Sequence, residues 1–286
     1  MTTITSHCMI ANLQIGVWTG HRLDKQASIE IVAAKDAESD AARVNKHLIP
    51  KEKLKPITTA QGKIRLYFYD KTSPWKDNGD RILTRVMYPR FIEEIGALIN
   101  EFKGHCEDFF KKVYPGEVAR AEFRMGEMFD PNDYPSIEQL RRKFFVNIDI
   151  DAVSEANDFR VTLDKDTVNA IRKDIETATE QRIIAAQKHV WERIAKTVGH
   201  FKDRMGAEVF KDATIENLAE LAEIMPGLNV TNDPAINKLA KDIQSRLLGH
   251  EPKEIREDDR LRKSLGKEAQ KIMSDIGGFM KAFGNS

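Results

Sequence analysis

Residues 164–205 read DKDTVNAIRKDIETATEQRIIAAQKHVWERIAKTVGHFKDRM, and this stretch decides the fold. It contains no proline and its first glycine is Gly199, so nothing interrupts a helix over most of its length. Asp164 is a suitable N-cap, and Asp166 lies in the first turn, where the helix dipole favours an anion. A helix of about forty residues is roughly 60 Å long, so we expect it to project from its domain or to carry a partner along its length.

Apolar and small residues form one stripe along this predicted helix. In the first half the stripe has the spacing of a coiled-coil seam and consists of Val168, Ile171, Ile175 and Ala178. The seam then slips and continues through Ile183, Ala186, Val190, Ile194, Thr197, Phe201 and Met205. Such a slip corrects the phase of the seam and predicts packing against more than one neighbour. We therefore expect an interaction surface here, with candidate residues Arg182, Ile183, His189, Trp191 and Ile194.

Composition excludes several classes of protein. The chain has 286 residues, and its 45 Lys and Arg balance its 45 Asp and Glu, so no global field attracts nucleic acid or an anionic membrane. The two cysteines, Cys8 and Cys106, form neither a disulfide framework nor a zinc motif. The N-terminus does not have the pattern of a signal peptide, and no apolar run is long enough to span a bilayer. We expect a soluble protein of the bacterial cytoplasm that binds no membrane.

Alternating patterns predict a small antiparallel sheet. Apolar residues alternate with polar ones along residues 8–18, and again along 144–153 and 158–163. The last two strands form a hairpin that leads directly into the long helix, and an isolated hairpin is marginal in water. We expect it to pair with the strand at 8–18.

Helical patterns account for most of the remaining chain. A broad apolar face predicts a helix at 89–113, which we expect to pack antiparallel to the helix at 164–205. Further helices are expected at 27–48 and at 117–129, and after Ser136, which lies in a capping-box pattern. The segment from Pro50 fits a helix better than a strand, although IRLYFY alone reads as a strand, and ILTRVM is either a short strand or an extended approach to the next helix.

The C-terminal region completes the predicted architecture. Residues 206–286 indicate shorter helices separated by a charged connector at 251–263, and Gly277-Gly278 weaken the last one. We expect an α+β protein that is predominantly α. It has a long antiparallel, coiled-coil-like helical hairpin on a small antiparallel sheet, with a C-terminal helical appendage. The predicted domains are 1–205 and 206–286.

Five segments carry a resemblance to a known family. They are IGVWTGHRLDK at 15–25, FYDKTSPWKDNGDRIL at 68–83, MFDPNDYPSIEQLRRKF at 128–144, NDFRV at 157–161 and HVWERI at 189–194. In these segments, which lie within about residues 13–200, the chain resembles an uncharacterised family found in tailed phages, prophages and some proteobacterial plasmids. Some relatives are encoded near AAA+ ATPases, which implies such an ATPase as a partner. The resemblance brings no catalytic motif.

Candidate catalytic groups have simpler structural explanations. Asp149 and Asp151 share the polar face of one strand, about 7 Å apart, and a solvated face explains them better than a metal site. The acidic loop containing Asp130, Asp133 and Tyr134 is typical turn and cap chemistry. His189 and His200 lie about 16 Å apart along the helix, too far to share a metal ion. The chain has no GxSxG, Walker A, GxGxxG or HExxH motif, so we expect no enzyme and no cofactor.

Nucleic acid is the alternative ligand. Two clusters interleave basic and aromatic residues, and their candidates are Lys63, Arg65, Tyr67, Arg141, Arg142 and Lys143. A solvated helix face explains such residues more often, and exposure of Trp18, Trp75 and Trp191 is the feature that would favour base stacking.

The leading hypothesis is therefore a non-enzymatic accessory protein of a phage or mobile element. It self-associates as a homo-oligomer and binds another protein through its long helices. The alternative is a nucleic-acid-binding accessory of phage replication or recombination, or a factor that counters a host defence.

Overall fold

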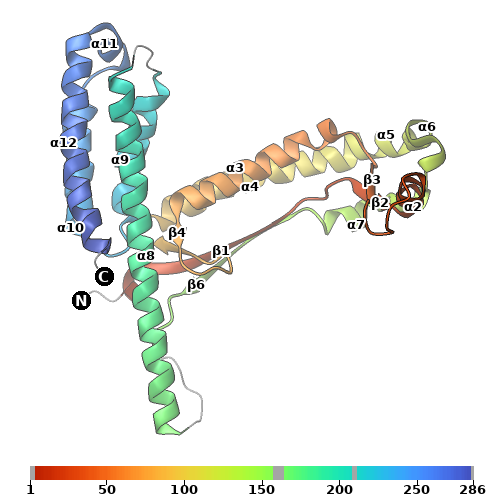
Figure 1. The fold of residues 1–286 in the computed structure, drawn as a ribbon, viewed down its shortest axis with the longest axis horizontal. Helices are drawn as coiled ribbons and strands as arrows, with labels where there is room; N and C mark the ends of the chain where they lie inside the picture. The colour runs from red at the N-terminus through yellow and green to blue at the C-terminus, as the bar shows by residue number, and fades with distance from the viewer. Residues whose placement is uncertain (1–3, 157–163, 208–210, 285–286) are drawn as a thin grey trace. The chain divides into compact units, whose positions relative to one another are not determined.

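The protein is predominantly helical with a small antiparallel sheet, as the sequence predicted (Figure 1). The computed structural model describes residues 4–156, 164–207 and 211–284. Its strands are β1 (Cys8–Gly16), β2 (His21–Asp24), β3 (Val44–His47), β4 (Ser73–Pro74), β5 (Arg81–Thr84) and β6 (Phe145–Ala152). Its helices of one turn or more are α1 (Ile4–His7), α2 (Lys25–Ala34), α3 (Lys55–Lys71), α4 (Tyr88–Asp108), α5 (Tyr114–Ala119), α6 (Ala121–Met125), α7 (Ile137–Arg141), α8 (Lys165–Met205), α9 (Ala213–Leu228), α10 (Pro234–Leu247), α11 (Pro252–Glu257) and α12 (Asp259–Gly284).

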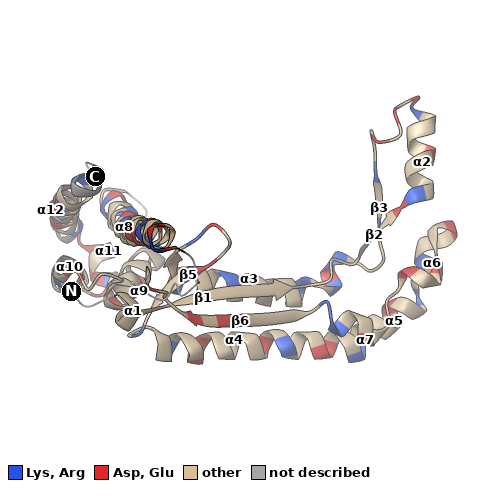
Figure 2. Ribbon diagram, turned by 90° about the horizontal axis from the view of Figure 1, so that it is seen from below, with Lys and Arg blue, Asp and Glu red and all other residues tan. Residues whose placement is uncertain are grey.

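The helix predicted at 89–113 is α4, which continues as one turn of π-helix at Phe109–Val113. Acidic and basic residues are interspersed along α4, and neither sign gathers on it (Figure 2). The segment after Pro50 is the helix α3, so the helical interpretation of IRLYFY is confirmed. Ser136 caps α7 in a complete capping box with Gln139, also as expected.

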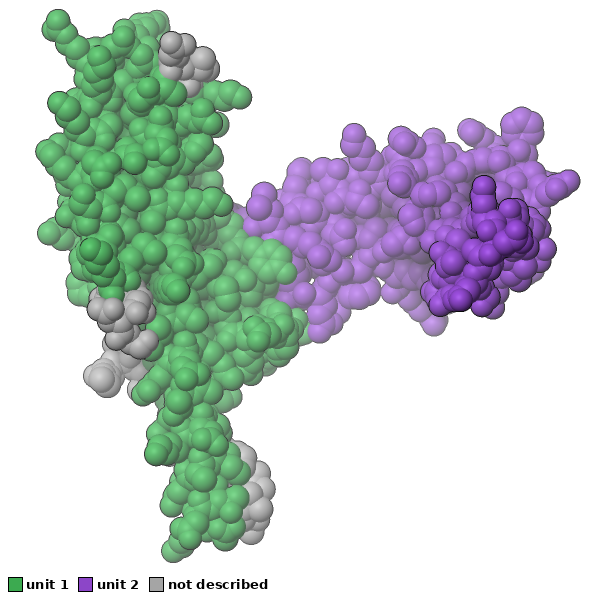
Figure 3. Space-filling view, viewed as in Figure 1, with its two compact units in different colours: residues 1–12, 68–92, 148–286 green, residues 13–67, 93–147 purple. Residues whose placement is uncertain are grey.

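The chain divides into two compact units, coloured separately in Figure 3. Unit 1 comprises residues 1–12, 68–92 and 148–286, and unit 2 comprises 13–67 and 93–147. The domain boundary predicted at residue 205 does not coincide with this division, because α8 and the helices after it belong to the same unit. The chain passes between the units after residues 12, 67, 92 and 147, inside β1, α3, α4 and β6. A division that cuts through continuous elements leaves no linker in the sequence.

The main sheet has the strand order β4-β5-β1-β6. β1 and β5 are antiparallel, with Cys8 opposite Thr84 and Ala11 opposite Arg81. The strands predicted at 8–18 and 144–153 are therefore confirmed as neighbours, and ILTRVM contributes the short strand β5. The strand predicted at 158–163 lies outside the described residues.

The long helix α8 begins where the sequence predicted, with the Asp164 carboxylate accepting a hydrogen bond of 2.9 Å from the Thr167 amide. Its long neighbour within unit 1 is α12, which runs antiparallel to it (Figure 1). Pairs along the two helices are Trp191 with Phe279, Gly199 with Met273 and Met205 with Gly266. We expected the helix at 89–113 in this role, but α4 from Glu93 onward belongs to unit 2. The C-terminal helices are thus part of the α8 core.

The charged stretch at 251–263 is helical, which corrects the expected connector. It forms α11 and the start of α12, and Ile255 is fully buried. The Asp258 carboxylate accepts hydrogen bonds from the amides of Arg260 and Leu261, so it caps α12. The helix continues through Gly277-Gly278, because Ile276 is buried and Phe279 stacks on Trp191.

The helix expected at 27–48 is wrong beyond Ala34. Lys35 is the C-cap of α2, and Asp36 then adopts a positive φ of 47°, a conformation that ends a helix. β3 follows and pairs antiparallel with β2, so that His21 lies opposite His47. The sequence contains no glycine or proline at this turn, so the break gave no local signal.

Several aromatic side chains pack against one another in the core of unit 2. The Phe109 and Phe144 rings lie 5.8 Å apart, and the Phe110 ring meets Phe144 edge-on at 5.4 Å. The Tyr114 hydroxyl donates a hydrogen bond of 2.7 Å to the Pro135 carbonyl. Burial raises the pKa of Tyr114 to about 12, so this hydroxyl stays protonated.

Candidate functional site

The second half of α8, residues 183–205, is part of the core of unit 1. Its buried side chains are Ala186, Val190, Trp191, Ile194, Val198, Phe201 and Met205. Five of them belong to the predicted slipped seam, so the seam itself is confirmed. Its occupants are other helices of the same unit, α12 and α9, together with the strand β4. The slipped seam therefore packs against more than one neighbour, as its change of phase predicted.

Two of the interaction candidates are unavailable to a partner. Trp191 and Ile194 have no exposed surface, and the indole of Trp191 stacks on the Phe279 ring at 4.9 Å and 19°. Ile183 is half-buried against a small cluster that contains Cys8, Ile10 and Trp75. These positions correct the expectation that the seam from Ile183 onward is an interface, because intramolecular packing already fills it.

His189 lies beside a cationic part of the same unit. It is half-buried, and its Nδ1 has no hydrogen-bond partner among the described residues. Burial, followed by the charges of Arg81 and Arg193, lowers its pKa below the ordinary value of 6.5. The imidazole is therefore neutral at neutral pH, which is consistent with a structural position.

A network of four charged side chains holds α8 against α3 and α9. Arg193 donates hydrogen bonds to the carboxylate and the carbonyl of Asp70. Lys71 is buried, and its ammonium lies 2.7 Å from Asp70 and 2.9 Å from Glu220. The two acids and two bases compensate one another, so the network stabilises packing without leaving a net charge.

The first half of α8, residues 165–182, has a different environment. None of its side chains is buried, although Val168, Ile171, Ile175 and Ala178 follow the coiled-coil spacing. Figure 1 shows this half running on past the end of α12. The stripe is therefore partly exposed, and α12 does not cover it.

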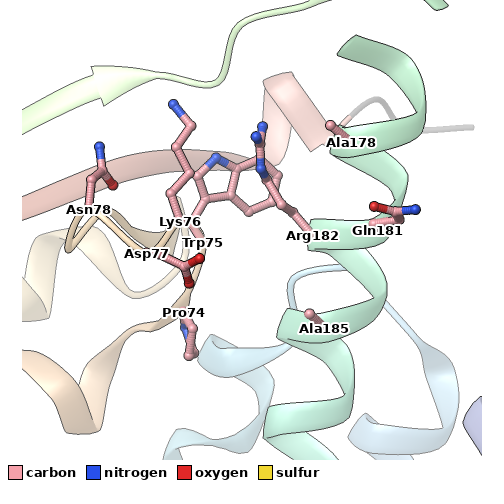
Figure 4. A pocket seen from close by; sticks show the side chains of 9 residues that line it. All are labelled: Pro74, Trp75, Lys76, Asp77, Asn78, Ala178, Gln181, Arg182 and Ala185. Carbon is pink, nitrogen blue, oxygen red and sulfur yellow. The ribbon is translucent and has the colours of Figure 1, made fainter. Parts of the chain in front are cut away.

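A pocket adjoins the end of this first half of α8 (Figure 4). Its volume is about 580 Å³, and its walls are Pro74, Trp75, Lys76, Asp77, Asn78, Ala178, Gln181, Arg182 and Ala185. The Arg182 side chain projects from α8 toward the indole of Trp75, which forms a largely buried wall. Of the interaction candidates, Arg182 alone lines this pocket. Sequence reasoning missed Trp75 as its neighbour, although the Pro-Trp pair within the DKTSPWKDNG turn marked an aromatic residue held on a loop.

The nucleic-acid candidates lie in two regions of unit 2, on α3 and at the end of α7 with the turn that follows it. Lys63, Arg65 and Tyr67 lie on α3, and Lys63 is paired with Glu101 at 2.8 Å. Arg141 makes a two-pronged contact with Glu107 and covers the Phe110 ring at 4.7 Å. These two cations are therefore compensated by acids.

Arg142 and Lys143 are exposed and line a cavity of about 430 Å³ together with Arg22 and Asp133. The three tryptophans are buried, at 7%, 6% and 0% exposure for Trp18, Trp75 and Trp191. The base-stacking part of the nucleic-acid hypothesis therefore loses its support.

The acidic candidates take part in ordinary structure. Asp149 and Asp151 are exposed on β6. The Asp130 carboxylate accepts a hydrogen bond from the Asn132 amide, and Tyr134 donates to the Leu48 carbonyl. Asp133 lies 2.6 Å from Lys46; burial opposes the lysine charge, but the contact with Asp133 outweighs it and raises the pKa of Lys46. These are structural roles in turns, caps and ion pairs.

The described part of the chain contains neither a reactive thiol nor a group of side chains placed to bind a metal ion. Cys8 and Cys106 are both buried, and burial raises the pKa of each thiol to about 12, so neither is a thiolate at neutral pH. No group of three or more His, Cys, Asp or Glu in residues 4–156, 164–207 and 211–284 is placed to hold a metal ion.

Comparisons with known proteins provide no identity. No family model matches the chain, and neither a curated protein nor a solved structure matches it. Among the described helices, none combines the length and the apolar character needed to cross a membrane.

Proposed function

We propose that this chain is a non-enzymatic accessory protein that self-associates through residues 165–182 of α8 and binds a further protein. The supporting observation is that this half of α8 has an apolar stripe but no buried side chain. The second half, which was the leading candidate, is occupied by α12 and α9. The interface is therefore assigned to the first half.

The occupant that best fits the stripe is a second copy of the same helix. The stripe has its apolar residues at 168, 171, 175 and 178, a spacing that is symmetric about residue 173. In an antiparallel pair centred there, Ile171 faces Ile175 and Val168 faces Ala178. A twofold interface requires such self-complementarity.

Charge contributes little to the register of this pair. Asp164 of one copy falls opposite Arg182 of the other, beside the Trp75 pocket, which is favourable. Asp166 and Glu180 lie on the helix face opposite the stripe, so they do not meet in this pair. The apolar residues therefore set the alignment over a contact about 25 Å long.

The biological setting rests on the resemblance described above. A phage or mobile element would encode the protein, and an AAA+ ATPase is a partner by association alone. Binding to nucleic acid is the weaker alternative, since the tryptophans are buried and both Lys63 and Arg141 are paired with acids.

Light scattering of the purified protein with Ile175→Asp tests the proposal. We expect the wild type to be a dimer or larger at micromolar concentration and the variant to be a monomer. Because Ile175 is half-buried rather than fully buried within the protomer, the variant should keep its circular dichroism spectrum. Thr177→Ala, an exposed position off the stripe, is the matched control and should remain assembled.

Two results would contradict the proposal. One is a wild-type protein that is strictly monomeric at these concentrations. The other is an Ile175→Asp variant that assembles as the wild type does, which would place the contact between copies elsewhere.

A further inference from the structure

A polar groove lies between the second half of α8 and the start of α9, apart from the proposed contact between copies. Two adjoining cavities of about 370 and 260 Å³ form it, and both are lined by His200, Thr214 and Asn217. The remaining walls are Asp70, Arg193, Lys196, Thr197, Glu220 and Leu221 in the first cavity, and Arg204, Lys211 and Ala213 in the second. All of these residues belong to unit 1.

The groove is lined by a regular row of basic side chains. Lys196, His200 and Arg204 are four residues apart on α8, so they share one face at intervals of about 6 Å. Lys211 extends the row beyond the helix. No ion pair or hydrogen bond of these four side chains occurs within the described part of the structure.

The acids in the groove do not cancel this charge. Asp70 is held by Arg193 and Lys71, and Glu220 by Lys71, so both carboxylates are already compensated. Asp203, which neighbours the row, pairs with Lys202 at 3.4 Å. Among the described residues, the row from Lys196 to Arg204 and Lys211 therefore keeps an unbalanced positive charge.

Neutral donors accompany the cations. Thr214, a largely buried residue, and Asn217 line both cavities. Thr214 also lies in the first turn of α9, where the positive end of the helix dipole adds to the field. Cations, a hydroxyl and an amide around one groove match a ligand with several anionic oxygens.

We propose that this groove binds a small anion that carries two or three linked phosphate groups. The basic row on α8 spans about 12 Å, which suits a di- or triphosphate. The compensated Asp70 and Glu220 close one end, so the positive surface does not continue as a track for a polymer. Among the described residues, no Phe, Tyr or Trp lines either cavity, whereas single-stranded nucleic acids are held largely by stacking on such rings. The volumes are near the lower end of the range for small-molecule sites.

Isothermal titration calorimetry of the full-length protein with sodium tripolyphosphate tests this proposal, with pyrophosphate as a second probe. Lys196→Gln and Arg204→Gln should each weaken tripolyphosphate binding about tenfold, the effect of one charge-assisted hydrogen bond. Binding should also weaken as salt rises. Lys202→Gln is the matched control, because Lys202 lies on the same turn outside the groove and pairs with Asp203. It should bind as the wild type does.

Two further ligands distinguish the alternatives. Titration with a single-stranded oligothymidylate or with polyglutamate should give weaker binding than tripolyphosphate. Tighter binding of either polymer would overturn the small-ligand assignment in favour of nucleic acid or an acidic protein segment. Absence of tripolyphosphate binding at low salt, or binding that Lys196→Gln and Arg204→Gln leave unchanged, would overturn the proposal. Light scattering of these variants keeps this result separate from self-association, which they should not alter.

Discussion

The two halves of α8 have the same secondary structure but different environments. Residues 183–205 bury seven side chains against α12, α9 and β4, whereas residues 165–182 bury none. Both halves carry an apolar stripe at helical spacing, so periodicity alone does not separate core from surface. The difference shows that a stripe becomes core only where another element of the same chain reaches it. The predictions below test this contrast, from the largest expected effect to the smallest.

The largest effect is expected for Trp191→Ala in the buried half. Deleting this fully buried indole removes its stacking on Phe279 and should lower the free energy of unfolding by about 3–5 kcal/mol. Urea denaturation followed by circular dichroism measures the change. Glu192→Ala, at the exposed neighbouring position, should stay within about 0.5 kcal/mol of the wild type.

The opposite outcome for Trp191→Ala would remove the contrast. If this variant kept wild-type stability but dissociated an oligomer, the second half of α8 would be an interface between copies rather than core.

An intermediate effect is expected for Asp70→Ala. Asp70 accepts hydrogen bonds from Arg193 and contacts Lys71, and both cations would lose this partner. Since Asp70 and Arg193 are each about a quarter exposed, we expect a loss of about 1–3 kcal/mol rather than the full cost of an unpaired buried charge. Urea denaturation measures it.

The matched control is Asp203→Ala, which removes an exposed ion pair with Lys202 on the same helix. Exposed pairs contribute little, so this change should be near zero. Equal losses for Asp70→Ala and Asp203→Ala would show that the charged network adds nothing beyond surface electrostatics.

The smallest effect concerns the N-terminus of the first half of α8 and depends on pH. Hydrogen bonds from the Thr167 side chain and from the Thr167 backbone amide lower the pKa of Asp164 below its ordinary value of 3.8. A lowered folded-state pKa means that the carboxylate stabilises the helix start fully above 3.8. This contribution is lost as the pH falls through the lower value.

Comparing the wild type with Asp164→Ala measures this cap. The wild type should have slower amide exchange in the first turn of α8 above pH 3.8, and the difference should vanish in acid. Exchange in residues 183–205 should be the same in both proteins at every pH. A difference that persisted in acid, or that spread to the buried half, would contradict a local cap.

Local chemistry made parts of the fold predictable. The Asp164 cap, the stripe of α8, the Ser136 capping box and the alternation in β1 and β6 depend on neighbours within a few residues. The end of α2 was missed because no local breaker marks it. Asp36 turns the chain without glycine or proline, and only the pairing of β3 with β2 reveals why.

The candidate site was less predictable than the fold. Of the proposed interaction residues, Arg182 lines a pocket, while Trp191 and Ile194 proved to be core. An exposed Trp and a buried Trp look alike in sequence, because their difference lies in what packs against them. The Lys196, His200 and Arg204 row was visible as an i, i+4, i+8 spacing. Its significance came only with the compensation of Asp70 and Glu220 by residues distant in sequence.

By itself, then, the sequence determined that α8 forms, where it begins and which stripe along it is apolar. Helix and cap formation depend on contacts within one or two turns, and these are written in adjacent residues. The tertiary structure decided which half of that stripe is covered, since α9 and α12, which follow α8 in the chain, fold back onto residues 183–205. It also decided that the chain passes from one unit to the other inside continuous strands and helices. Both results depend on which segments of the chain meet, and the local pattern of an apolar stripe does not specify its partner.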